Sequence, residues 1–325
     1  TSFFALGVNA LALDSEGTAG DNITYIFNAE TGALVLSGTG KIKNYAFSGS
    51  KDIKSVTIGE GITEVGTDAF NNCTNITSVS FPSTLEVISS YAFGHNSGLT
   101  EIVIPNGVTT VSVCAFGYCE NIRSVSLPAS VEYMDGASFD TTSLTEFTID
   151  EENPYFKALD GNLYSADMTK FIVYCGAKQD AAFVLPDTVR SISDYAFSTA
   201  PNLRKITLPD GMTKVDSSAF RGCSFVEEIV LPDTITKIES GAFEYCSGLK
   251  KLDIPSGVTE IDSYAFDGCS SLEKLVIPVG VTMIYSYTFM SCNVLHVYFM
   301  NPECAFGDYP YIVSDSITIH SNERC

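Results

Sequence analysis

Apolar residues recur along this chain in a 23-residue unit, and the dipeptide Ala-Phe marks the period. Each unit begins with an aliphatic pair two residues apart, as in Ile102 and Ile104. Because successive side chains of a strand point to opposite faces, this spacing predicts a short strand with one buried face. Proline usually follows, and its missing amide donor ends the pairing. The ten marker phenylalanines are Phe47, Phe70, Phe93, Phe116, Phe139, Phe197, Phe220, Phe243, Phe266 and Phe289.

The second half of each unit has a different period. Aliphatic residues follow the proline at spacings of three, as in Val258 and Ile261. This spacing predicts a tight return path of about three residues per turn, as in a 3-10 segment. One unit cannot bury its own apolar side, so neighbouring units must stack, about 4.8 Å apart. The pattern therefore predicts a β-rich solenoid with short strands on one face and turns or 3-10 segments on the other.

The repeat is interrupted in places that suggest an organisation within one continuous solenoid domain. A 58-residue gap separates the fifth and sixth phenylalanines, and Asp160-Gly161 between apolar runs predicts a β-hairpin there. We expect Lys157 to Tyr174 to form strands that project from the solenoid. At the end of the chain the pattern fades, so the last segment is either a second cap or a cap cut short. The expected segments are a strand and hairpin cap (1–46), a first repeat block (47–149), the inserted hairpin (150–182), a second repeat block (183–300) and the C-terminal segment (301–325).

Composition narrows the class of function. The 39 acidic and 18 basic residues give a formal net charge of −21, which disfavours nucleic acid and anionic lipid as partners. No apolar run approaches the roughly 20 residues of a membrane span. The apolar stretch Phe3 to Leu13 is either the end of a signal peptide or the start of the first strand. Because the sequence begins at Thr1, we expect it to be a fragment.

The ten cysteines invite a metal or disulfide interpretation, but their spacing favours another one. Six of them lie three residues after the marker phenylalanine, where serine, asparagine, threonine and alanine also occur. A column that accepts all these residues predicts buried thiols acting as small fillers at a tight turn. Zinc sites instead use cysteines two to four residues apart. If disulfides form, the expected pairs are Cys114 with Cys119, or Cys304 with Cys325.

Catalytic constellations are not evident in the sequence. The three histidines, His95, His296 and His320, lie far apart in repeat phase, so we expect neither a catalytic triad nor a metal site. The Gly38-Thr39-Gly40 motif is followed neither by a helix nor by the Lys-Ser or Lys-Thr pair of a phosphate-binding loop, since Ile42 comes after Lys41. We therefore expect no enzyme activity and no cofactor.

The chain resembles the BspA-like subclass of leucine-rich-repeat proteins. The resemblance rests on the Ala-Phe-x-x-Cys-x-x-Leu unit, the motif at 38–40 and the insertion from Asn153 to Tyr164, and it covers essentially residues 21–325. It implies a right-handed leucine-rich-repeat solenoid that is secreted or displayed on the cell surface. It also implies adhesion, with host or extracellular-matrix molecules as partners, and it transfers no catalytic motif.

The strand face of the second repeat block is the candidate binding surface. Positions seven, eight and ten after the phenylalanine are predicted to point outward there, and many are charged. One interpretation is a site for a protein or glycan; the other is that opposite charges on adjacent strands pair and keep the sheet soluble. The expected function is a monomeric binding scaffold, with a spacer that presents other domains as the alternative. The candidate residues are Arg204, Lys205, Glu227, Glu228, Lys250, Lys251, Asp253, Glu273 and Lys274.

Overall fold

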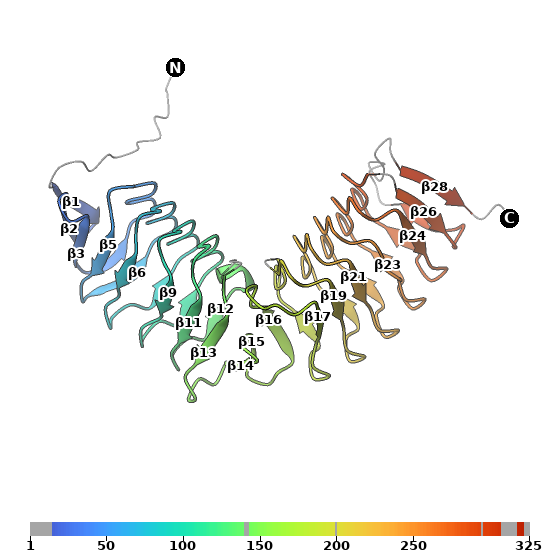
Figure 1. Ribbon diagram of the computed structural model, residues 1–325, viewed down its shortest axis with the longest axis horizontal. Coiled ribbons are helices and arrows are strands. Elements are labelled where there is room, and N and C mark those ends of the chain that lie inside the picture. Colours follow the sequence, from blue (N-terminus) through green and yellow to red (C-terminus); the bar gives the residue numbers. More distant parts are fainter. Residues whose placement is uncertain (1–14, 140–142, 199, 294, 307–316, 322–325) are drawn as a thin grey trace, which may run out of the picture. The chain divides into compact units, whose positions relative to one another are not determined.

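Both compact units of the chain are β-solenoids whose coils have the predicted length, which confirms the predicted architecture (Figure 1). The computed structural model describes residues 15–139, 143–198, 200–293, 295–306 and 317–321. The chain divides after Gly161 into the units Thr1–Gly161 and Asn162–Cys325. Each unit is described separately below.

The first unit contains one series of strands that carries the predicted apolar pairs. It comprises β1 (Ser15–Gly20), β2 (Ile23–Asn28), β3 (Ala33–Gly38), β5 (Ser55–Ile58), β7 (Ser78–Ser80), β9 (Glu101–Val103), β11 (Ser124–Leu127) and β13 (Glu146–Ile149). From β3 onward, paired strands run parallel with equivalent residues of successive coils in register, as for Val56 and Val79. The strand β14 (Phe156–Leu159) follows near the end of the unit.

The return side of the first unit forms a second parallel sheet, where the sequence predicts only turns and 3-10 segments. Its strands are β4 (Gly40–Ile42), β6 (Ile62–Val65), β8 (Val87–Ile88), β10 (Thr110–Val111) and β12 (Tyr133–Met134). The spacing of three between aliphatic residues did not predict these strands, because each is only two to four residues long. A 3-10 helix, Gly136–Phe139, occurs in the fifth coil, which is one residue short.

The predicted N-terminal hairpin is present. Strands β2 and β3 pair antiparallel, and Gly32 closes their turn with a φ of 73° and an amide that donates to Asn28 at 2.8 Å. Strand β1 pairs antiparallel with β2, so a strand accompanies the hairpin in this part of the chain. The hairpin extends the sheet because β3 pairs parallel with β5. The stretch Phe3 to Leu13 lies outside the described residues.

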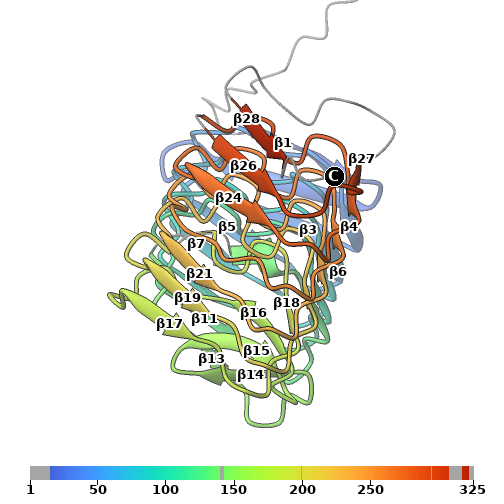
Figure 2. The same ribbon diagram turned by 90° about the vertical axis from the view of Figure 1, so that its right-hand side faces the viewer.

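The second unit repeats the two-sheet plan. On one side are β17 (Ala182–Val184), β19 (Lys205–Thr207) and β21 (Glu228–Val230), stacked in order in Figure 2, and further along β24 (Lys274–Ile277), β26 (Leu295–Phe299) and β28 (Ile317–Ser321). The return side holds β20 (Lys214–Val215), β22 (Lys237–Ile238), β23 (Glu260–Ile261), β25 (Met283–Ile284) and β27 (Ala305–Phe306). Near the start of the unit, β15 (Asn162–Ser165), β16 (Lys170–Val173) and β18 (Ser191–Ile192) form a mixed sheet.

The inserted hairpin is present in the second unit, but the expectation that it projects from the solenoid is wrong. Strands β15 and β16 do pair antiparallel, but β16 also pairs parallel with β18, in the plan of the return sheet. Tyr164, Phe171 and Tyr174 are almost fully buried, and the Phe171 ring lies 4.8 Å from that of Phe197. Burial of these rings makes the segment part of the core.

Tyr174 explains the wide gap between the fifth and sixth phenylalanines. It lies one full period before Phe197, and its amide donates to Ala196 at 2.8 Å. The Phe220 amide makes the equivalent bond to Ala242 at 2.9 Å. Tyr174 therefore takes the marker position of an additional coil, and only about half a coil of the gap is truly inserted.

The coils continue beyond Phe289, although the sequence pattern fades there. Strand β26 pairs in register with β24, and β28 in turn with β26, so the coils continue through the described part of residues 301–325. Ala305-Phe306 does not replace the marker dipeptide; Phe306 pairs with Ile284 in the return sheet. Residues 307–316 and 322–325 lie outside the described part of the chain.

The marker phenylalanines form a continuous stack inside each unit. From Phe47 to Phe139 successive ring centroids are 5.1–5.5 Å apart and nearly parallel, and from Phe197 to Phe289 they are 5.4–5.8 Å apart. Residues two before and two after the phenylalanine commonly have a positive φ, as at Tyr91 and His95 around Phe93. These left-handed residues turn the backbone sharply on both sides of the ring, which places each phenylalanine above the previous one.

Candidate functional site

The predicted charged residues of the second unit form two rows across the strand face. The first row consists of Arg204, Glu227, Lys250 and Glu273, and the second of Lys205, Glu228, Lys251 and Lys274. Backbone hydrogen bonds link the first row, since Glu227 N donates to Arg204 O at 2.8 Å and Lys250 N to Glu227 O at 2.9 Å. In the second row Lys205 pairs with Glu228, and Glu228 with Lys251. These eight residues, together with Asp253 near Lys251, are called the charged rows.

Opposite charges within the charged rows are paired. Lys205 Nζ lies 2.9 Å from a Glu228 carboxylate oxygen, and Lys250 Nζ lies 2.9 Å from one of Glu227. Lys251 Nζ approaches Asp253 at 3.0 Å and Glu228 at 3.8 Å. This arrangement matches the interpretation in which charges on adjacent strands neutralise one another.

These ion pairs are exposed to solvent and therefore stabilise the fold little. The Lys250 and Lys251 side chains are each 62% exposed, and that of Asp253 is 84% exposed. The hydrogen bond from Lys205 lowers the pKa of Glu228, and the hydrogen bond to Asp253 raises the pKa of Lys251. Both shifts favour the charged forms, so Glu228 and Lys251 stay ionised at neutral pH.

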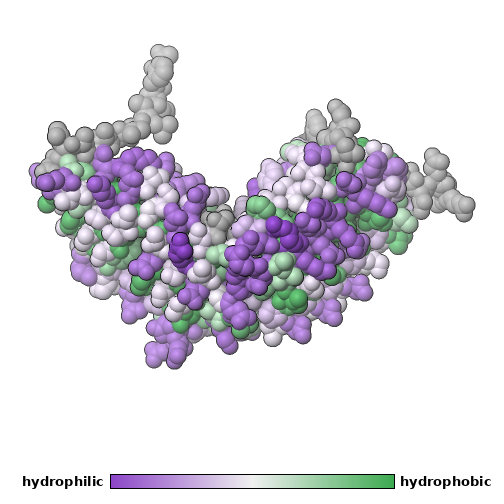
Figure 3. Space-filling view, in the orientation of Figure 1, coloured by the Kyte–Doolittle hydropathy of each residue, from purple (hydrophilic) through white to green (hydrophobic). Residues whose placement is uncertain are grey.

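Two basic residues of the rows contact aromatic rings. The Arg204 guanidinium lies 5.8 Å from the centroid of Phe225, whose side chain is half exposed, and Lys274 Nζ lies 5.0 Å from that of Tyr298. A hollow of about 540 Å³ is lined by Lys250, Glu273 and the neighbouring turn residues Ser270, Ser271 and Asn293. In Figure 3, hydrophilic and apolar side chains are interspersed in small patches over the visible face of this unit. The rows thus combine charge, exposed rings and a concave polar surface.

A second set of charged residues lies on the return sheet and was missed by the sequence analysis. Lys214 contacts Glu239 at 3.0 Å and Asp216 at 3.1 Å, and Lys237 contacts Glu260 at 3.3 Å. The hydrogen bond to Glu239 raises the pKa of Lys214. The 23-residue period places Lys214, Lys237 and Glu260 in successive coils, but without a predicted return sheet their ion pairs could not be predicted.

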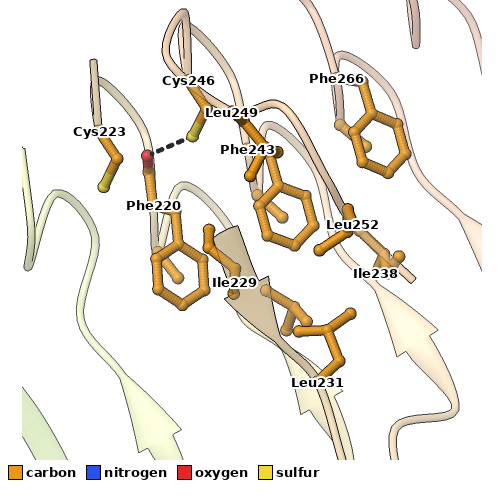
Figure 4. Close-up of a cluster of buried hydrophobic side chains, with 14 of the residues drawn as sticks. Phe220, Cys223, Ile229, Leu231, Ile238, Phe243, Cys246, Leu249, Leu252 and Phe266 are labelled. Carbon is orange, nitrogen blue, oxygen red and sulfur yellow. Dashed lines mark hydrogen bonds between the residues drawn. The ribbon is translucent and has the colours of Figure 1, made fainter. Parts of the chain in front are cut away.

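The cysteine column is buried, as predicted, but it also has a hydrogen-bonding role. Cys246 Sγ donates to the carbonyl oxygen of Phe220, in the preceding coil, at 3.0 Å (Figure 4). Where asparagine replaces cysteine, Asn96 Nδ2 donates to Phe70 O at 2.9 Å and to Phe93 O at 2.8 Å. The column therefore accepts small residues, and at most of the described positions this residue also satisfies a buried carbonyl, although Ala200 has no side-chain donor. The cysteines that make this bond to the preceding coil's phenylalanine are Cys73, Cys119, Cys246, Cys269 and Cys292.

Burial makes these thiols poor nucleophiles. Desolvation raises the pKa of Cys73 to about 11 and that of Cys119 to about 12, so the thiolate is scarce at neutral pH. The Cys119 thiol donates to Phe93 O at 3.1 Å and is thus not in the disulfide considered with Cys114. The other considered pair, Cys304 with Cys325, includes a residue outside the described part of the chain.

A buried ionisable cluster was also missed. Arg221 contacts Glu244 at 2.9 Å and lies between the rings of Tyr195 and Tyr245, with centroids 5.5 and 5.6 Å away. Glu244 and Asp267 are almost fully buried, and desolvation raises the pKa of both. All three charged residues directly follow a marker phenylalanine, a position at which the repeat has no fixed residue type.

The expectation that the histidines lie far apart is wrong for two of them. His296 Nδ1 and His320 Nε2 are 3.1 Å apart on the neighbouring strands β26 and β28. In these strands His296 is paired directly with Thr318, and His320 with Tyr298. The two histidines therefore lie on one face of the sheet, one diagonal step apart.

Two features are absent from the part of the chain that the structure describes. No helix there is long and apolar enough to cross a membrane. Within the same residues, no three or more histidine, cysteine, aspartate or glutamate side chains come together as a group that could hold a metal ion.

Comparisons with solved structures give bacterial repeat proteins with the same fold. The pneumococcal vaccine antigen PcpA aligns with a TM-score of 0.68 and 20% identity over 95% of this chain and 94% of its own. A leucine-rich-repeat protein from Eubacterium ventriosum has a TM-score of 0.59 and 20% identity, covering 93% and 98%. A leucine-rich cell surface protein from Faecalibacterium prausnitzii has a TM-score of 0.57 and 25% identity, covering 91% and 96%.

The sequence itself matches a family model. No curated protein matches the chain. The model of the BspA type leucine-rich repeat region, however, matches residues 40–159 and 174–301, which together are most of the sequence. The second matched segment begins at Tyr174, the residue that takes the marker position of the additional coil. The chain belongs to the BspA-type leucine-rich-repeat family.

Proposed function

We infer that this protein is a non-enzymatic binding scaffold, secreted or displayed on a cell surface, which recognises a protein or glycan through its repeat surface. Its family membership supports this role, as does its similarity to a bacterial cell surface protein and a pneumococcal vaccine antigen. The parallel coils provide a rigid support for outward side chains. A function based on recognition needs only such a surface, without catalytic groups.

The charged rows are the proposed contact surface. The observation that carries this assignment is the concentration of five basic residues, all but one of them lysines, in a chain with a net charge of −21. With four acidic neighbours, the rows have a net charge of +1, unlike the acidic molecule around them. Their exposed ion pairs can exchange partners at little cost in stability. The polar hollow beside Lys250 and Glu273 offers a concave place for a partner's side chain or sugar.

Charge reversal tests this assignment. The variant K250E/K251E/K274E is applied to immobilised extracellular-matrix proteins and to a glycan array, together with the unmodified protein. The control variant K214E/K237E reverses charges on the return sheet instead. We expect the first variant to lose binding by about tenfold or more, as when charged contacts at the centre of an interface are removed. The control should bind normally.

The outcomes separate the proposed function from the alternative. If both variants bind a captured partner as the unmodified protein does, the charged rows are not the contact surface. If the unmodified protein binds nothing on either array, the recognition role fails, and the spacer that presents other domains becomes the better proposal. Circular dichroism of each variant verifies that the reversed charges have left the fold intact.

A further inference from the structure

We propose that His296 and His320 form a binding site for one divalent transition-metal ion, such as Zn²⁺, on the strand face of the second unit. This inference goes beyond the partner binding proposed above and does not depend on it. His296 lies on β26 and His320 on β28, and both side chains are partly exposed. The site is therefore open to an ion from solvent.

The distance between the two imidazoles suits a shared metal ion. His296 Nδ1 and His320 Nε2 are 3.1 Å apart. Two imidazole nitrogens bound to one ion at about 2.0–2.1 Å, with roughly 90–109° between the bonds, lie about 2.9 to 3.4 Å apart. The observed separation falls within this range, so the two rings are already close enough to share one ion.

The neighbouring side chains hold His320 in place. The Tyr298 ring stacks on the His320 ring, with centroids 4.3 Å apart and an interplanar angle of 8°. Tyr298 and His320 are also directly paired across the two strands. This contact limits rotation of the imidazole, and a ligand that is already oriented loses less conformational entropy when the ion binds. Tyr298 is thus a positioning residue rather than a ligand.

One neighbouring charge opposes binding. Lys274 is the cross-strand partner of His296, and its ammonium lies 5.0 Å from the Tyr298 ring centroid. A cation at this place repels a metal ion. The site should therefore bind weakly, and removal of the lysine charge should strengthen it.

The imidazole nitrogens determine which class of metal ion this site binds. Zn²⁺, Cu²⁺ and Ni²⁺ bind imidazole well, whereas Mg²⁺ and Ca²⁺ prefer oxygen ligands. In the metal-free pair one ring nitrogen donates its proton to the other. When the ion binds, that proton moves to the opposite nitrogen of the same ring, so both facing nitrogens present lone pairs and no net proton is released. Water molecules complete the coordination sphere.

Calorimetric titration with Zn²⁺ tests the site, with Mg²⁺ as the control ion. We expect one Zn²⁺ per chain for the unmodified protein and for H95Q, which alters the histidine of the other unit. H296Q and H320Q should each bind at least about tenfold more weakly, the order of loss seen when the surroundings of a metal ligand are disturbed. Y298L should bind more weakly because it removes the ring stack, Y298F should restore binding because it keeps the ring, and K274Q should bind more tightly.

Spectroscopy on the unmodified protein keeps the test valid if a variant misfolds. On addition of Zn²⁺, the ring C–H resonances of His296 and His320 should shift and those of His95 should not. Co²⁺ should give visible bands without a strong thiolate charge-transfer band, which would reveal cysteine ligands. Unchanged Zn²⁺ affinity in both histidine variants, or a thiolate band as the sole Co²⁺ signal, would overturn the proposal.

Discussion

The phenylalanine stack predicts a specific pattern of energetic coupling. The Phe243 ring is fully buried and lies 5.5 Å from the ring of Phe220 and 5.4 Å from that of Phe266, nearly parallel to both. Replacing Phe243 by leucine keeps most of the apolar volume but removes both aromatic contacts. Each such contact contributes about 0.5–1.5 kcal/mol beyond the area it buries. The two contacts together contribute about 1–3 kcal/mol, so F243L should lower the free energy of unfolding by at least about this amount once the loss of packing is added.

Double-mutant cycles isolate the aromatic contribution from the loss of volume. Phe243 and Phe266 are in contact, so F243L/F266L should show a coupling free energy of about 0.5–1.5 kcal/mol. Phe220 and Phe266 are separated by the Phe243 ring, so F220L/F266L should be additive within about 0.3–0.5 kcal/mol. Urea unfolding followed by circular dichroism gives the four free energies of each cycle. Equal coupling in the two cycles would refute the stack as the source, since general softening of the core couples all three sites alike.

Three further predictions concern buried polar groups. Asn96 donates to two buried carbonyl oxygens, so N96L should destabilise the protein by about 2–4 kcal/mol in urea unfolding, and N96C should cost less because cysteine can satisfy one of them. Because burial raises the pKa of Cys119 to about 12, its thiol should resist alkylation by iodoacetamide at pH 8 until denaturant is added. Mass spectrometry of the alkylated peptide measures this, and rapid labelling in the native state would contradict the burial of Cys119. Burial raises the pKa of Asp267 above its value in the unfolded chain, so the folded state binds more protons at this residue. The contribution of Asp267 to the free energy of unfolding is therefore greatest at low pH and falls as the pH rises through the folded pKa. D267N should remove this loss. Urea unfolding of D267N and of the unmodified protein at pH values from about 3 to 7, which include the ordinary aspartate range, measures the difference.

The coil was predictable because its inward positions repeat the same requirements. A marker phenylalanine, an aliphatic pair and a small residue recur with one spacing, and each corresponds to a buried column in the structure. The coil at Tyr174 was not predicted because tyrosine replaces phenylalanine there. In addition, the insertion of about half a coil shifts its position relative to the repeats that precede it. Its position one full period before Phe197 was the available indication. Periodicity thus predicts a coil well while its marker residue keeps its type and its neighbours keep their length.

The candidate sites were less predictable because they depend on register between coils. The rows at Lys205 and Glu228 follow the common period, so their proximity could be predicted, although the individual ion pairs could not. The histidine pair depends on a coil between β26 and β28 that is one residue shorter than this period, since Leu295 pairs with Ile317. A coil of the full length would have placed His320 out of step with His296. One residue of coil length therefore decides whether two imidazoles share a face.

The contrast between inward and outward positions also indicates where this protein can acquire specificity. An inward residue must fit a stacked column and, as Cys246 and Asn96 show, can also satisfy a carbonyl of the neighbouring coil. Any change there alters two coils at once and costs stability. An outward residue such as Lys250 or Asp253 makes only exposed contacts, so its replacement leaves the core intact. Recognition can therefore change on the strand face while the solenoid stays the same, and this is the physical basis for placing the proposed binding function on the charged rows.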